Sequence, residues 1–126
     1  MILDSSAIVA VIRGEPERGA FLRTMQSADT LSVSAPTVLE SAMVLGPESL
    51  SLLRRFFSGM AIEVVPFGPE HVPVAHDAFA RYGKRRGSPA NLNYGDCFSY
   101  ALAKVSGEPL LFKGDDFTHT DITPAV

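Results

Sequence analysis

The sequence predicts an α/β sandwich with a mostly parallel central sheet. Short apolar runs alternate along the chain with longer segments whose apolar residues recur every three to four positions. Proline and glycine lie between these segments, where they begin and end helices. With 126 residues and one cysteine, the chain is expected to fold as a single domain over residues 1–126 without an internal disulfide.

The first half of the chain is predicted to contain two strands and four helices. Residues 1–3 form a short apolar run that ends at Asp4, and a helix is expected from there to about Ile12, before Gly14 and Pro16. The elements expected next are a helix over 17–26, a strand over 31–35, a helix over 36–45 that opens at Pro36, and a helix that opens at Pro47 and carries Leu50, Leu53, Phe56, Phe57 and Met60 at helical spacing.

The second half continues the alternation. The elements expected there are a strand over 62–67, a helix over 70–82, a loop over 87–92, a helix over 94–105, and a strand over 109–112. The tail after Thr120 is a candidate for a short edge strand. Tyr94, Phe98 and Tyr100 are expected to lie in the core or its wall rather than to form base-stacking platforms. Phe56, Phe57 and Met60 either pack internally or line a groove.

Several classes of protein are disfavoured by composition and motif. No apolar run approaches the roughly 18–20 residues of a membrane span, and the N-terminus lacks the basic segment of a secretory signal, so a cytoplasmic protein is expected. The chain has neither a Gly-x-x-x-x-Gly-Lys phosphate loop nor a Gly-x-Gly-x-x-Gly fingerprint. Cys97 lies within an apolar helix face, which argues against a nucleophilic role.

Three apolar segments each contain a single acid. Asp4 is the only charged residue in residues 1–12, Glu40 in 35–46, and Asp96 in 91–103. An unpaired carboxylate in the interior costs several kcal/mol, and two carboxylates about 5 Å apart repel by roughly 3 kcal/mol at an effective dielectric of about 20. A cluster of such acids must therefore take up protons or bind a cation, and the sequence predicts a divalent metal site.

The predicted elements allow the three acids to meet. Asp4 ends the first strand, and ligands of parallel sheets bind beyond the carboxyl ends of the strands. Taken singly, however, Asp4 could merely cap the helix that follows, Asp96 could merely complement a helix N-terminus, and Glu40 could be an exposed helical residue. Ser6 and Asn93 are candidates for supporting Asp4 and Asp96.

Two further groups of charged residues each allow two interpretations. Asp115 and Asp116 follow the strand expected over 109–112, and they either supply a fourth acid or simply form a turn. Lys84, Arg85 and Arg86 follow one another at the end of a predicted helix. They either are a solvated helix end or contact a phosphate backbone. The formal net charge of −3 argues against a passive nucleic-acid binder unless metal neutralises several acids.

The acids and their surroundings resemble those of the PIN-domain nucleases. Leu3-Asp4-Ser5-Ser6-Ala7 is similar to the Asp-Thr-Ser-Ala opening of that family, and Glu40 and the Asp96 of Asn93-Tyr94-Gly95-Asp96 match its next two acids. The resemblance covers the whole chain and closely follows the VapC toxins of toxin–antitoxin pairs. Their usual fourth acid stands where this chain has Gly114, so the resemblance implies that Asp116, or Asp115 in its place, takes the role.

The resemblance implies a PIN-like α/β/α sandwich and an endoribonuclease that depends on Mg²⁺ or Mn²⁺. Asp4, Glu40, Asp96 and Asp116 would be its catalytic and metal-binding acids, and water attack on phosphorus would leave 5′-phosphate and 3′-hydroxyl ends. It also implies a VapB-type antitoxin partner, a homodimer, and contact with DNA only through the antitoxin. The alternative is a non-catalytic PIN-like module that binds RNA or protein. The sequence names neither the RNA target nor the number of metal ions.

Overall fold

The computed structural model of the chain describes residues 1–126 and contains six helices and four strands. The strands are short, and a helix follows each of the first three. In chain order the elements are β1 (Ile2–Leu3), α1 (Ser5–Arg13), α2 (Arg18–Ser27), β2 (Leu31–Ser34), α3 (Ala35–Leu45), α4 (Leu50–Met60), β3 (Ile62–Val65), α5 (His71–Tyr82), α6 (Tyr94–Ser106) and β4 (Leu110–Leu111).

The four strands form one parallel sheet in the order β3-β2-β1-β4. This confirms the predicted α/β class and the mostly parallel sheet. The predicted edge strand after Thr120 is reduced to one isolated parallel bridge between Leu110 and Pro124. Pro124 has no backbone N–H to donate, which limits strand pairing at this edge.

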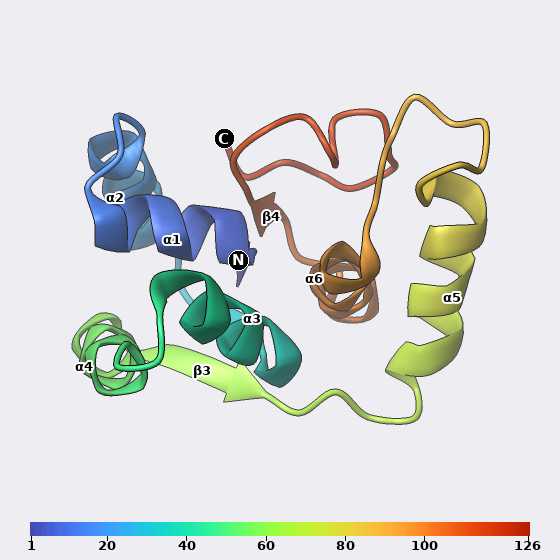
Figure 1. Cartoon of the computed structure of the whole chain (residues 1–126). Coiled ribbons are helices and arrows are strands. Elements are labelled where there is room, and N and C mark those ends of the chain that lie inside the picture. The colour runs from blue at the N-terminus through green and yellow to red at the C-terminus, as the bar shows by residue number, and fades with distance from the viewer.

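Helices cover both faces of the sheet because adjacent strand residues point to opposite sides. Ile2 and Leu110 belong to one buried apolar cluster together with Tyr100 of α6. Leu3 and Leu111 belong to the other, which includes residues of α1, α2 and α4. Figure 1 shows α2 and α4 at one end of the molecule and α5 at the opposite end.

Most helix boundaries follow the predicted punctuation. Pro36 lies in the first turn of α3, and Gly14 ends α1 in the left-handed conformation with φ 69°. The helix expected to open at Pro47 instead begins at Leu50. Residues 46–49 form a turn in which the Ser49 hydroxyl donates to the carbonyl oxygens of Ala42 and Gly46.

The segment between α5 and α6 carries the basic residues identified in the sequence. Its base is closed by two hydrogen bonds, from the Lys84 N–H to the Leu92 oxygen (3.1 Å) and from the Leu92 N–H to the Tyr82 oxygen (3.0 Å).

None of the helices is long and apolar enough to cross a membrane.

Candidate active site

Asp4 connects the end of β1 to two helices. As the N-cap of α1, its Oδ2 accepts hydrogen bonds from the Ser6 N–H (3.1 Å) and the Ser6 hydroxyl (2.6 Å). Its Oδ1 accepts from the hydroxyl of Ser99 in α6 at 2.6 Å. Asp4 is buried, so these three donors hold its carboxylate in one orientation. The capping role considered for Asp4 is therefore real, and it coexists with a contact to α6.

Asp96 lies in the first turn of α6 and is also buried. It forms a reciprocal capping pair with Asn93: the Asn93 Oδ1 accepts from the Asp96 N–H, and the Asp96 Oδ2 accepts from the Asn93 N–H, both at 2.9 Å. The structure thus places Asn93 where it orients the Asp96 side chain.

Glu40 reaches the same region from α3, one turn after β2. Its carboxylate lies directly over Gly95, the residue before Asp96. A Cβ atom at Gly95 would lie only 1.9 Å from Glu40 Oε2, so only glycine permits this approach. The Glu40 Oε1 is buried and has no hydrogen-bond partner, which is an unfavourable state for a carboxylate oxygen.

The electrostatics show that the acids influence one another. The pKa of Asp96 is raised to about 7, chiefly by burial and also by the charges of Asp4, Asp116 and Glu40, against the lowering effect of the Asn93 N–H. Burial also raises the pKa of Glu40, helped by the Asp4 charge and opposed by the Ser5 hydroxyl. Four acids from separate parts of the sequence therefore share one negative region.

Asp115 and Asp116 differ in their relation to this region. Both are exposed in the turn after β4, but only the charge of Asp116 contributes to the raised pKa of Asp96. Gly114 has φ 95°, a conformation that favours glycine. An acid at position 114 would strain this turn. This is a physical reason why the fourth acid is found two residues later, at Asp116.

The chemistry of this set suits a hard divalent cation, because every donor is a carboxylate or hydroxyl oxygen. The unpartnered Glu40 Oε1 and the raised pKa of Asp96 both indicate negative charge without compensation. As the side chains stand, no group of three or more His, Cys, Asp or Glu residues is arranged so that it could hold one ion.

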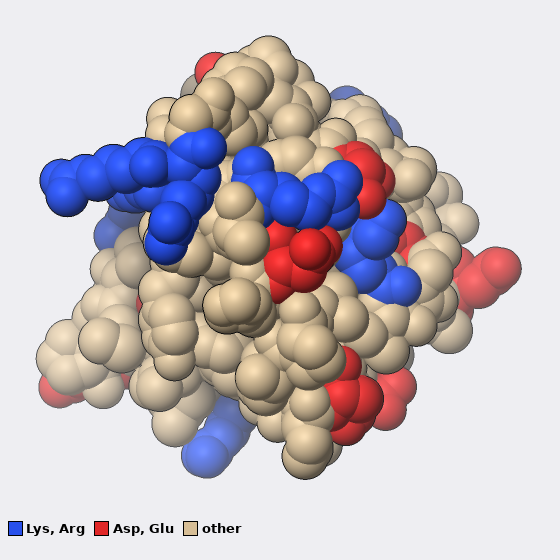
Figure 2. Space-filling model, turned by 90° about the vertical axis from the view of Figure 1, so that its right-hand side faces the viewer, with Lys and Arg blue, Asp and Glu red and all other residues tan.

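The basic residues Lys84, Arg85 and Arg86 are exposed and form no salt bridges. Arg81, one turn earlier, instead pairs with Asp77 and Asp121. Figure 2 views this face and shows basic side chains that project freely and others that lie against acidic ones. The projecting group is thus available to an anionic ligand.

Sequence reasoning missed three residues that shape the site. Ser99 lies one helical turn after Asp96, a spacing that could have placed both on one face. Thr37 supports Ser99, with 3.3 Å between their hydroxyl oxygens. Gly95 had no signal in the sequence, because its role depends on how α3 packs against α6.

Known proteins resemble the chain over its full length. Residues 1–122 match the PIN domain family. Ribonuclease VapC42 of Mycobacterium tuberculosis is 43% identical over 129 residues, which cover 99% of this chain and 98% of that protein.

Two solved structures have the same fold. The crystal structure of M. tuberculosis VapC20, described as a sarcin–ricin loop cleaving toxin, covers 98% of both chains with a TM-score of 0.73 and 16% identity. A chain of a toxin–antitoxin complex from Klebsiella pneumoniae has a TM-score of 0.71 and 14% identity, over 95% of this chain and 92% of that one. The sequence match and the shared fold establish that the chain belongs to the PIN-domain family, in the group of VapC ribonucleases.

Proposed function

We propose that the chain is the endoribonuclease toxin of a VapBC-type toxin–antitoxin pair and depends on Mg²⁺ or Mn²⁺. The observation that carries the proposal is the shared negative region of Asp4, Glu40, Asp96 and Asp116 at one edge of the sheet. The relatives named as VapC ribonucleases support it. A cytoplasmic location follows from an RNA substrate and an antitoxin partner.

Each proposed site residue has a separate task. Asp4, Glu40, Asp96 and Asp116 would hold the ion, which when bound would supply an activated water and stabilise charge on the phosphate. Ser6 and Ser99 orient the Asp4 carboxylate through their hydroxyls, and Asn93 orients Asp96 through its backbone N–H. The exposed Lys84, Arg85 and Arg86 would hold the RNA backbone on either side of the cleaved bond.

Cleavage of RNA by the purified chain tests the proposal directly. We expect cellular RNA to be cut when Mg²⁺ or Mn²⁺ is present and to stay intact with EDTA, with fragments that carry 5′-phosphate ends. Sequencing those ends also identifies the target. A folded chain that binds RNA but never cuts it in any divalent metal would instead indicate a non-catalytic module.

The close approach of Glu40 to Gly95 gives a second prediction. Alanine is favoured over glycine in a helix by about 1 kcal/mol, so Gly95→Ala should leave α6 at least as helical. The new Cβ would nevertheless displace the Glu40 carboxylate, and we expect RNA cleavage to fall by roughly tenfold or more, as expected when a catalytic group is misplaced by about 1 Å. Gly59→Ala in α4 is the control, because its Cβ would meet nothing within 4 Å. Equal cleavage by both variants would show that the position of Glu40 is unimportant.

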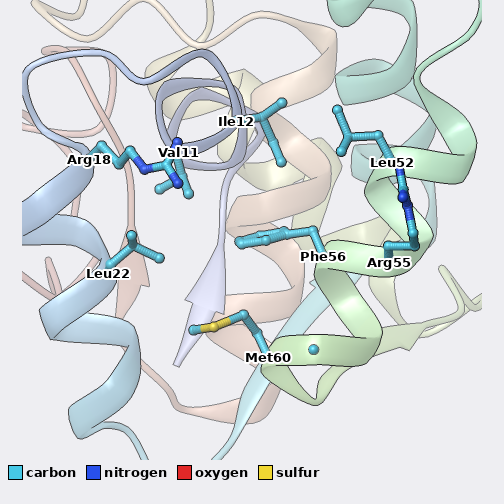
Figure 3. Close-up of a pocket in the computed structure, with 9 residues that line it drawn as sticks. Val11, Ile12, Arg18, Leu22, Leu52, Arg55, Phe56 and Met60 are labelled. Carbon is cyan, nitrogen blue, oxygen red and sulfur yellow. The ribbon is translucent and has the colours of Figure 1, made fainter.

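An apolar groove between α1, α2 and α4 suits the proposed antitoxin. The cavity of about 620 Å³ is lined by nine residues, six of them hydrophobic, with Arg18 and Arg55 at its margin. Figure 3 shows Ile12, Leu22 and Phe56 pointing towards the same space. Met60 lines the groove as well, whereas Phe57 is buried in the core. Of the two positions predicted for these residues, Phe56 and Met60 thus take the groove and Phe57 takes the interior. An antitoxin segment with apolar side chains and an acid for the arginines would fit there.

Substitution in the groove tests this partner site. Leu52 lines the groove and is partly exposed, whereas its neighbour Ser51 is exposed outside it. Co-expressed with the product of the upstream gene, Leu52→Glu should lose most of the co-purifying partner, because a buried charge would face apolar side chains. Ser51→Glu should retain it, since the same charge is added in the same helical turn. If both variants retained the same amount of the co-purifying partner, the antitoxin would bind at another surface.

The proposed assembly also includes a homodimer. Leu39, Met43 and Val44 expose apolar side chains on α3, which supports contact with a second copy. DNA would be contacted only through the antitoxin.

A further inference from the structure

A second apolar cavity lies between α5 and α6. It measures about 500 Å³, and seven of its eight lining residues are hydrophobic. Tyr94 and Cys97 of α6 line it on either side of Asp96 in the sequence. The first turn and a half of α6 thus carries Asp96 together with two residues that line the cavity.

Aromatic rings form most of the cavity wall. The ring centres of Tyr94 and Phe98 lie 4.8 Å apart, and those of Phe67 and Phe98 lie 4.9 Å apart, both pairs edge to face. Sequence reasoning placed Tyr94 in the core or its wall, but the residue is 80% exposed. That prediction was therefore wrong in one respect, because Tyr94 lines the mouth of the cavity. An exposed aromatic ring beside an apolar cavity offers a stacking surface.

One cationic side chain lies against a ring of this cavity. The Arg86 guanidinium lies 5.2 Å from the centre of the Phe79 ring, which lines the cavity. Lys84 and Arg85 precede it without salt-bridge partners. Cys97 donates its thiol to the Asn93 oxygen. A ligand with an apolar planar part and an anionic backbone matches this combination.

We propose that the cavity holds one unpaired nucleobase of a single-stranded RNA substrate, stacked on Tyr94, with the adjoining phosphates on Lys84, Arg85 and Arg86. Aromatic side chains bind unstacked bases of single-stranded RNA in this way, and a cationic groove follows the backbone. The inference rests on the proposed ribonuclease function, since it makes the cavity the subsite beside the cleaved bond. It implies that the enzyme cuts in loops or unpaired segments.

Tryptophan fluorescence tests the stacking without cleavage. The chain contains no tryptophan, so Tyr94→Trp introduces a single reporter at the cavity, and Val105→Trp introduces one at the exposed far end of α6. We expect adenosine monophosphate to quench the Tyr94→Trp signal saturably and the Val105→Trp signal weakly and without saturation. Ribose 5-phosphate, which lacks the base, should quench neither. Equal quenching by the two ligands would overturn the inference.

Affinity measurements extend the test to RNA. An eight-nucleotide single-stranded oligoribonucleotide is bound to proteins that carry Asp4→Asn, so that cleavage does not interfere. Adding Tyr94→Ala should weaken binding by roughly 5- to 100-fold, the scale of one stacked base. The affinity of the Tyr94→Phe protein should stay within about twofold of that of the protein that keeps Tyr94. Removing one base from the RNA should weaken its binding to the protein that keeps Tyr94, but should weaken its binding to the Tyr94→Ala protein little further.

Two outcomes separate this inference from the proposed function. Base-dependent binding without any cleavage by the unmodified chain would refute the nuclease and keep the subsite. Cleavage with unchanged affinity in Tyr94→Ala would keep the nuclease and refute the subsite. A change in oligomeric state on Tyr94→Ala with unchanged RNA affinity would likewise refute it, and would assign the cavity to a protein interface.

Discussion

Replacing Asp4, Glu40 or Asp96 by its amide should abolish RNA cleavage while the fold is kept. Asp4→Asn, Glu40→Gln and Asp96→Asn each preserve shape and remove one charge from the shared region. We expect losses of about 10²-fold or more in cleavage rate, the scale seen when one electrostatic stabiliser is removed. The measurement is the initial rate of RNA cleavage in Mg²⁺, with circular dichroism to show that each variant is folded. Toxicity on induction in cells should disappear with the cleavage.

The paired acids Asp115 and Asp116 provide a matched comparison for this prediction. Both are exposed in the same turn, so Asp115→Asn and Asp116→Asn perturb folding equally little. Only Asp116 acts on the pKa of Asp96, and we expect its amide to lower cleavage far more than that of Asp115. The reverse order would assign the fourth acid to Asp115. Full activity in all of Asp4→Asn, Glu40→Gln and Asp96→Asn would refute the site.

The metal-free protein should become less stable as pH rises from about 4 to 7. The pKa of Asp96 is raised from 3.8 to about 7 in the folded chain, mainly by burial. Within that window the folded state keeps a proton that the unfolded state has released, so the free energy of unfolding falls with rising pH. One pKa unit corresponds to about 1.4 kcal/mol, and we expect a total loss of roughly 2–4 kcal/mol, complete above pH 7. Urea unfolding at pH 4 and pH 8 in EDTA measures it.

Asp96→Asn isolates the charge that causes this loss. The amide oxygen of asparagine can still accept the Asn93 N–H, so the helix cap is kept while the charge is removed. We expect the variant to be more stable than the unmodified chain at pH 8 and about equally stable at pH 4. Asp115→Asn should change neither value. A variant less stable than the parent at pH 8 would show that the carboxylate contributes more to the cap than it costs by burial.

The two predictions share one physical origin. An acid region tuned to bind a cation is a source of instability when the cation is absent. Mg²⁺ should therefore stabilise the unmodified chain more than Asp96→Asn, which would link the site to metal by a measurement independent of RNA.

The sequence by itself determined the helices and strands and identified the acids that lie alone in apolar segments. Periodicity and proline–glycine punctuation were sufficient for the alternation of strands and helices, because both depend on neighbouring residues only. The isolation of Asp4, Glu40 and Asp96 in apolar segments was visible for the same reason: composition reveals which side chains are carried into the interior.

Only the tertiary structure decided what these residues touch. The Ser99 hydroxyl on Asp4, the Glu40 carboxylate over Gly95 and the effect of the Asp116 charge on the pKa of Asp96 each join segments far apart in the sequence. The exposure of Tyr94 was settled in the same way. Helical periodicity predicts the face on which a side chain lies, whereas the packing of α3, α5 and α6 sets the distances between faces, and those distances decide which atoms meet.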